Sequence, residues 1–510
     1  MRVRRGRERR PAGLLAAGAL VAVFTLLPFA HVAFYASDVG LDVAREQLIR
    51  PRIGSLLLNT VTLVIAGVTL SAVIATACAW FVERTDVPLP RVWRALLVAP
   101  LAVPAFVNGY AWVSLTHAVE GFAGAVLIVS LSYFPFIYLP VTASLQRIDP
   151  AFEEAARTLG LGRGATFARI VLPQLRPALL GGGLLVALHL LAEFGALQML
   201  RFPTFTTAIY EQFGSTFNGP AASLTASALA ILCLVVLLIE LRLRGQATIA
   251  RIGRGAPRKA DRTRLGRART PVIGLLVAVL VLALGVPIAS LVRWMVVGAS
   301  TTFPVADLVS TTMTTLGLAA AGAAAATVLA IPVALLVVRH ASRTSTLIER
   351  STFTASALPG IVIALALVSL SLTFTPAFYQ TTIVLVAGYV IMFASRAVVG
   401  VRAALDHAPP VLEDVSGALG QGSWATFGRV TLPLVAPGVG AGAALVFISI
   451  STELTATLLL APIGTRTLAT QFWSEAQSLS YGAAAPYALL LVLLSIPATF
   501  LLGRMAVRRP

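Results

Sequence analysis

Residues 153–173 read EEAARTLGLGRGATFARIVLP, and residues 413–433 read EDVSGALGQGSWATFGRVTLP. Both stretches are polar, and each lies between long apolar runs. A shift of 260 residues superimposes them without a gap and also places Glu193 on Glu453. The shift matches Gly160 with Gly420, Thr166-Phe167 with Thr426-Phe427, and Leu172-Pro173 with Leu432-Pro433. Self-similarity at a fixed period is the signature of a repeated structural unit, so the chain is predicted to consist of two related halves.

The composition of the chain is that of an integral membrane protein. Its 510 residues are 57% hydrophobic and only 12% charged, whereas a soluble chain is about a quarter charged. The formal net charge of +18 comes from 39 basic residues, of which only Lys259 is not arginine. These arginines cluster between apolar runs and lack the interleaved aromatic side chains on which single-strand binders stack bases. We therefore expect no nucleic acid partner.

Twelve apolar runs are long enough to cross a bilayer, which takes about 20 residues. A segment in lipid must satisfy its own backbone hydrogen bonds, and these runs do not alternate as the strands of a barrel do. The predicted fold is all-α, with about twelve transmembrane helices. The first run is too long for a signal peptide and lacks a cleavage site. The runs cover residues 13–36, 55–81, 95–116, 121–145, 178–200, 222–241, 271–292, 311–338, 352–374, 381–401, 437–461 and 483–503.

The distribution of basic residues predicts the orientation in the membrane, because cytoplasmic loops are enriched in arginine and lysine. With the N-terminus inside and twelve alternating helices, the inner segments hold 33 basic residues and the outer segments hold 6. Both termini are therefore expected in the cytoplasm. The chain is predicted to be a multi-pass protein of the cell (inner or cytoplasmic) membrane.

One long polar linker divides the chain. We expect a cytoplasmic N-terminus at 1–12, a first half at 13–243, a basic cytoplasmic linker at 244–270 and a second half at 271–510. The two repeated loops then occupy residues 147–177 and 403–437. Because each half holds six helices, an even number, the halves share one orientation and are related by an axis along the membrane normal.

The repeated loop itself is predicted as a short helix, a glycine break, and a second short helix that ends at Leu-Pro. Pro150 precedes the first helix, where its fixed geometry is tolerated. Glu153 and Glu154 lie in the first turn, where acidic side chains favour the helix dipole. Gly160 and Gly162 are expected to break the helix. The alternative is an ordinary loop with amphipathic helices, but two copies in corresponding places argue against it.

The spacing Glu154-Ala-Ala, Gly160 and Ile170-x-Leu-Pro173 resembles the EAA loop of ABC importer permeases with the type I fold. The second copy departs from the pattern, because it reads Asp414-Val-Ser and keeps only the acid, Gly420 and Leu-Pro. In that family the loop is a coupling helix that docks on an ATPase subunit. The resemblance assigns this role to Glu153, Glu154, Ala155, Ala156, Gly160, Leu172 and Pro173, and to Glu413, Asp414, Gly420, Leu432 and Pro433.

The resemblance also implies partners. These are an ABC ATPase subunit, in two copies, and a periplasmic or lipid-anchored substrate-binding protein, besides membrane lipid. The chain has no Gly-Lys-Ser/Thr phosphate loop of its own, so ATP hydrolysis is expected on the separate subunit and no enzyme activity here. Cys78 and Cys233 fall inside apolar runs, and the five histidines have no metal-ligand spacing. We expect neither a cofactor nor a metal site.

Two stretches bear on the substrate. Residues 451–474 (STELTATLLLAPIGTRTLATQFWS) and 192–213 (AEFGALQMLRFPTFTTAIYEQF) resemble the iron(III) branch of fused two-half permeases. The predicted function is therefore import of a small solute, with ferric iron ahead of thiamine, polyamine and phosphonate. A secondary transporter with twelve helices and a membrane scaffold or receptor are the other classes. A secondary transporter usually keeps more ionisable residues in its helices.

Glu193 and Glu453 are candidates for the substrate pathway. Each is predicted about fifteen residues into its helix, or roughly 22 Å along it, past the midplane of a core about 30 Å thick. A carboxylate there is costly unless it faces a cavity or a partner. His189, one turn before Glu193, is the nearest candidate partner. The alternative is a carboxylate that already lies in water or caps a neighbouring helix.

Proline and glycine carry two further predictions. Pro104 and Pro359 fall within the third and ninth apolar runs and predict kinks there. Glycines crowd the starts of the fifth and eleventh helices, at 181–183 and at 438–442. Small residues let helices approach closely in lipid, so these helices are expected to pack tightly or to meet where the two halves join.

Overall fold

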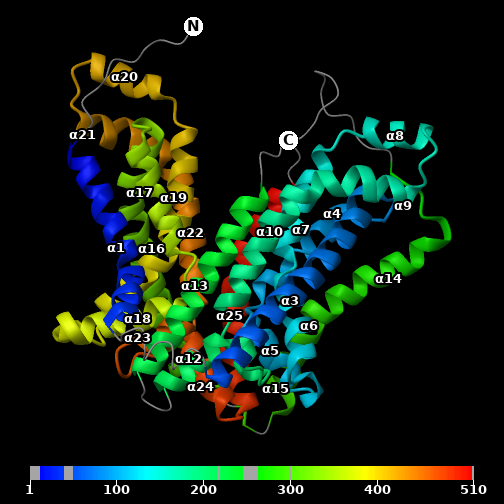
Figure 1. The fold of residues 1–510 in the computed structure, drawn as a ribbon, viewed down its shortest axis with the longest axis horizontal. Helices are drawn as coiled ribbons and strands as arrows, with labels where there is room; N and C mark the ends of the chain where they lie inside the picture. Colours follow the sequence, from blue (N-terminus) through cyan, green and yellow to red (C-terminus); the bar gives the residue numbers. More distant parts are fainter. Residues whose placement is uncertain are drawn as a thin grey trace. The chain divides into compact units, whose positions relative to one another are not determined.

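A computed structural model describes residues 12–38, 50–214, 219–244, 262–298, 300–301 and 303–507 (Figure 1). Residues 1–11 of the predicted N-terminal segment 1–12 and most of the linker 244–270, Lys259 included, lie outside these residues. The described residues form helices and turns, with one isolated bridge between Thr85 and Thr263. The helices gather into two compact units, named here the α3 unit and the α16 unit after their longest helices.

The α3 unit comprises residues 45–304 and 471–510. Its helices are α3 (Pro51–Arg84), α4 (Pro90–Leu96), η1 (Ala99–Ala102), α5 (Ala105–Val113), η2 (His117–Val119), α6 (Phe122–Tyr133), α7 (Pro135–Arg147), α8 (Ala151–Thr158), α9 (Arg163–Thr166), η3 (Phe167–Val171), α10 (Leu172–Ala192), α11 (Gly195–Met199), α12 (Phe205–Gly214), α13 (Gly219–Arg244), η4 (Gly266–Ala268), α14 (Arg269–Leu280), η5 (Val281–Gly285), α15 (Val286–Val297) and α25 (Tyr481–Val507).

The α16 unit comprises residues 1–44 and 305–470. Its helices are α1 (Ala12–Asp38), α16 (Val305–Arg339), α17 (Arg343–Ala355), α18 (Gly360–Phe374), η6 (Pro376–Phe378), α19 (Thr382–Asp406), α20 (Pro410–Ala418), α21 (Ser423–Thr426), η7 (Phe427–Thr431), α22 (Leu432–Ser451) and α23 (Thr455–Leu460), and the chain leaves the unit within α24 (Leu468–Gln477).

Eight described helices are long and apolar enough to cross a membrane, or eleven if each bent pair counts as one span. The last apolar run falls in α25, in which Tyr481–Pro497 forms a further apolar segment. An all-helical, multi-spanning fold is therefore confirmed, while the count of twelve stays a prediction.

The predicted kinks at two prolines are breaks. The chain bends by 84° before α5 and by 100° before α18, and Pro104 and Pro359 are the residues that precede those helices, with ψ of 142° and 145°. A proline has no N–H to continue a helical ladder, and an extended ψ turns the chain away from the helix axis. Each proline therefore starts a new half-helix instead of bending one long helix.

Each half of the sequence places its first helices in the compact unit formed mainly by the other half. The first helix, α1, packs on α16, α17 and α18, all of which come from the second half of the sequence. A Cβ on Gly18 would lie 2.5 Å from Leu336 and 3.5 Å from Ile348, so α1 approaches these helices closely. Conversely, α15 packs on α5, which belongs to the first half of the sequence, and on α25. The two compact units therefore do not coincide with the two halves predicted from the sequence repeat.

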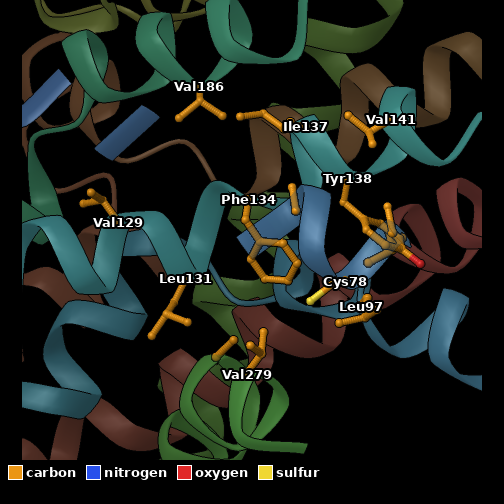
Figure 2. Packing of buried hydrophobic residues seen from close by; sticks show 14 of the residues in the cluster. Cys78, Leu97, Val129, Leu131, Phe134, Ile137, Tyr138, Val141, Val186 and Val279 are labelled. Carbon is orange, nitrogen blue, oxygen red and sulfur yellow. The ribbon is translucent and has the colours of Figure 1, made fainter. Parts of the chain in front are cut away.

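The core of the α3 unit is an apolar cluster supplied by α3, α6, α7, α10 and α14. Phe134, Cys78, Leu97 and Val279 point toward a common centre in Figure 2, and the side chains of Phe134 and Leu97 are fully buried. The glycine prediction for close packing holds here, because a Cβ on Gly182 would lie 2.8 Å from the Cα of Ile137 in α7. These contacts fix α3, α7 and α10 against one another.

Candidate functional site

The repeated loop has the same geometry in both units. In the first copy, helix α8 ends at Thr158 and the chain reverses at Gly160, whose φ is +84°. The Leu161 amide donates to the Ala156 carbonyl at 3.0 Å, and the Gly160 amide donates to the Arg157 carbonyl at 3.0 Å. This pair of bonds is a Schellman cap. The cap requires one residue in the left-handed conformation, which glycine adopts without strain. The predicted glycine break is thus confirmed.

The second copy repeats the cap. Gly420 has a φ of +81°, and the Gln421 amide donates to the Ser416 carbonyl at 3.1 Å. The loss of the two alanines at Val415 and Ser416 therefore leaves the backbone of the loop unchanged. Both loops present a short helix, a left-handed glycine and a return helix in the same order.

The prediction that the return helix ends at Leu-Pro is wrong. Helical backbone continues from Gly164 to Ala192 in the first copy and from Ser423 to Ser451 in the second. Pro173 and Pro433 occupy the first turns of α10 and α22, directly after a π turn that absorbs the register change. The π turn shifts the hydrogen-bond register directly before each proline, so the helical segment continues although the proline has no N–H to donate.

The loops expose apolar side chains that the sequence prediction did not single out. Leu159 is 83% exposed and its counterpart Leu419 is 76% exposed, each directly before the left-handed glycine. Trp424, in the second copy, is 87% exposed. The sequence signal was the dipeptide Leu-Gly at the same place in both repeats. Glu154 and Ala155 are also exposed, as is Asp414, whereas Ala156 is buried. The outer face of each loop thus combines an acid with an exposed leucine.

The first acid of each loop is directed inward instead. Glu153 lies 3.1 Å from Arg84, the last residue of α3, and both side chains are more than nine-tenths buried. Glu413 lies 2.9 Å from Arg339, the last residue of α16. These arginines were not among the predicted site residues. Each lies at the predicted cytoplasmic end of a membrane helix, where a basic residue is expected for topology alone and does not indicate a specific contact.

Glu193 is not fifteen residues into a helix, as predicted. Helix α10 ends at Ala192, so Glu193 follows its last turn, with a ψ of 125°. Its carboxylate accepts a hydrogen bond from the Ala196 amide at 2.9 Å, at the start of α11, and another from the Tyr133 hydroxyl of α6. The helix was placed too late because hydropathy marks the apolar part of a helix, not the start of its hydrogen-bond ladder.

Glu453 occupies the equivalent place after α22. Its carboxylate accepts hydrogen bonds from the Ala456 and Thr457 amides, each at 3.1 Å, at the start of α23. The Thr457 hydroxyl donates to the same carboxylate at 3.0 Å and lies 2.8 Å from the Tyr389 hydroxyl. Both glutamates thus cap the next helix. Glu193 connects directly to the half-buried Tyr133, and Glu453 connects through Thr457 to the buried Tyr389.

His189, the predicted partner of Glu193, is held by other groups. Its Nδ1 lies 2.7 Å from the Leu185 carbonyl, and its ring lies 4.4 Å from that of Phe136 and 5.4 Å from that of Tyr133. Tyr133 therefore contacts both residues. Among the described residues, no group of three His, Cys, Asp or Glu side chains is placed to hold a metal ion.

The chain is similar to known transport proteins. The family described as "Binding-protein-dependent transport system inner membrane component" matches residues 75–244 and again residues 326–509. The Fe(3+)-transport system permease protein FbpB 2 of Haemophilus influenzae is 36% identical over 96% of this chain and 97% of its own length. The sulfate transport system permease protein CysT of Escherichia coli is 27% identical over 42% of this chain.

The molybdenum transport system permease protein ModB of Escherichia coli is 29% identical over 34% of this chain and 84% of its own length. Such relatives therefore correspond to one half of the present chain, which agrees with the double match of the family and with the two copies of the loop. This chain belongs to the family of inner membrane components of binding-protein-dependent transport systems.

Proposed function

We propose that this chain is the permease of an ATP-driven importer and that it moves ferric iron from an external binding protein into the cytoplasm. The observation that carries the substrate is the 36% identity to an iron(III)-transport permease over 96% of the chain. The sulfate and molybdenum relatives cover less than half of it and support only the class of transporter. Thiamine, polyamine and phosphonate are the alternative substrates within that class.

The proposed topology has twelve spans in two pseudo-symmetric halves, 13–243 and 271–510. Both termini and the linker 244–270 lie in the cytoplasm. The double family match supports two halves, and the excess of arginine in the inner segments supports this orientation.

The two repeated loops are proposed as docking elements for two copies of an ABC ATPase subunit. Their Schellman caps present Leu159 and Leu419 to solvent, and the acids Glu154 and Asp414 in the same loops are also exposed. An exposed leucine and a charge on one loop are suited to docking on a partner, because apolar burial supplies affinity while the charge fixes orientation. Gly160 and Gly420 hold this arrangement, and Leu172-Pro173 and Leu432-Pro433 begin the helices that carry motion into the membrane.

Glu193 and Glu453, with His189 beside the first, are proposed to lie along the substrate pathway. Each carboxylate joins the end of one membrane helix to the start of the next short one. The capping bonds account for part of the acceptor capacity of each carboxylate, which holds about four lone-pair sites. The acceptor sites that remain on each carboxylate suit a cation in transit.

Reconstitution tests the function. The chain is inserted into liposomes together with its ATPase subunit and the ferric-loaded binding protein, and iron uptake is measured with and without ATP. The proposal expects uptake that requires all three components and ATP, and that is not supported by loaded thiamine-, polyamine- or phosphonate-binding proteins. Uptake driven by an ion gradient without the ATPase would instead identify a secondary transporter.

A further inference from the structure

The same three-part contact occurs at the base of both coupling loops. In the α3 unit, Nη2 of Arg84 lies 3.1 Å from Oε1 of Glu153 and donates to the Ile148 carbonyl at 3.4 Å. In the α16 unit, Nη2 of Arg339 lies 2.9 Å from Oε1 of Glu413 and donates to the Ala408 carbonyl at 3.0 Å. The shift of 260 residues relates Ile148 to Ala408 as well as the two glutamates. One arginine in each unit thus holds both the entry to the coupling helix and its first turn.

These contacts connect each loop to a long helix. Arg84 and Arg339 are the last residues of α3 and α16, which have 34 and 35 residues. The side chains of Arg84 and Glu153 are 6% and 9% exposed, and those of Arg339 and Glu413 are 12% and 26% exposed. The Arg84–Glu153 pair is buried, so it is screened little by salt and is costly to separate, and the Arg339–Glu413 pair is partly shielded in the same way. The coupling helix is therefore held to the end of the spanning helix.

The same two helices make a matched contact further along. The Phe205 amide, at the start of α12, donates to the Thr60 hydroxyl of α3 at 3.3 Å. The Leu468 amide, at the start of α24, donates to the Thr315 hydroxyl of α16 at 2.9 Å. Each threonine precedes its arginine by 24 residues, or about 36 Å of helix. Figure 1 shows α8 at one end of the α3 unit and α12 at the other.

We propose that the pairs Arg84–Glu153 and Arg339–Glu413 are positioning contacts that make α3 and α16 move with the coupling helices. Each helix then transmits a displacement of its loop to the segment that follows Glu193 or Glu453. This inference rests on the proposed docking of an ATPase on the loops. It assigns Glu153 and Glu413 to the inside of the permease.

The two contacts differ in strength. Nε of Arg339 also donates to both oxygens of Glu413, at 3.1 and 3.2 Å, and the Thr431 hydroxyl donates to Oε1 at 3.2 Å. Glu153 has Arg157 at 3.8 Å as its second cation. A bidentate pair fixes direction as well as distance, so the α16 contact is expected to carry more of the coupling.

The test compares Arg339→Gln with Arg402→Gln in the complete complex. Arg402 makes a 2.6 Å ion pair with Glu349 of α17 in the same unit but does not hold the coupling helix. The measured quantities are iron taken up per ATP hydrolysed, and the mobility of a spin label at Leu419 in the permease without its ATPase. We expect uptake per ATP to fall about tenfold in Arg339→Gln, within the range usual for coupling between sites. The label should also become more mobile, and Arg402→Gln should change neither quantity.

Two further variants guard against a simple folding defect. The exchange Arg339→Glu with Glu413→Arg should recover at least half of the lost coupling on a logarithmic scale. Thr315→Val, at the other end of α16, should lower uptake per ATP in the same direction without mobilising the label. Unchanged uptake per ATP in Arg339→Gln, an equal loss in Arg402→Gln, or a Thr315→Val variant that couples normally would overturn the inference. Failure of the wild-type complex to import with ATP would refute the proposed function instead, and the label would still report on the contact.

Discussion

Replacement of Gly160 tests whether the left-handed turn sets the docking geometry. At a φ of +84° a side chain strains the backbone, yet a Cβ built on Gly160 has no neighbour within 4 Å. The cost is therefore conformational alone, about 1–2 kcal/mol for a residue other than glycine. If the loop relieves that strain by leaving the docking geometry, the competent fraction falls by a factor of about 5–30. Since the strain is local and exposed, the protein should still insert and fold.

A series of variants separates strain from size. Gly160→Asn should be close to wild type, because asparagine tolerates the left-handed region, whereas Gly160→Ala should weaken binding of the ATPase and Gly160→Val should weaken it further. Gly162→Ala is the matched control, since Gly162 also has open space around its Cα but no positive φ. Binding is measured by titration of the ATPase against permease in nanodiscs, and coupling by uptake in liposomes. Equal effects of Gly160→Val and Gly162→Ala, or none from Gly160→Val combined with Gly420→Val, would refute the reasoning.

Three other outcomes are expected. Reporter fusions at Ala165 should score cytoplasmic and fusions at Ser478 external, and a reversed score at either site would contradict the proposed orientation. Leu159→Asp should weaken ATPase binding at least tenfold, because burial of a leucine contributes about 1.5–3 kcal/mol; normal affinity would exclude this leucine from the interface. The double variant Glu193→Gln with Glu453→Gln, at normal protein levels, should lose most iron uptake while the binding protein still docks. Uptake near wild type would leave the two carboxylates only their capping role.

The repeated loop was predictable because its determinants are local. A Schellman cap depends on six consecutive residues, and glycine at the left-handed position is visible in the sequence of both copies. The membrane class was predictable for a similar reason, since apolar length is a property of each segment by itself. Neither needs knowledge of what the segment packs against.

Helix ends and breaks were less predictable, because they depend on the hydrogen-bond ladder and on neighbours. Pro104 fits a kinked helix as well as the break before α5, and only the surrounding helices decide between them. Glu193 was placed within a helix because apolar residues continue on both sides of it. Its actual contact, the Tyr133 hydroxyl, lies 60 residues away in the sequence, and no local pattern marks such a pair.

Arg84 and Arg339, at the bases of the two loops, also make contacts that the local sequence does not predict. Glu153 follows Arg84 by 69 residues, whereas Glu413 follows Arg339 by 74, so one shift of 260 residues does not align the arginines. The difference lies in the intervening segment, where α4 has 7 residues and α17 has 13. The same ion pair thus forms although the segments between arginine and glutamate differ in length. It cannot be predicted from the sequence around either residue. It forms because the end of α3 or α16 meets the start of α8 or α20 in each unit, which is the arrangement that the proposed transmission of movement requires.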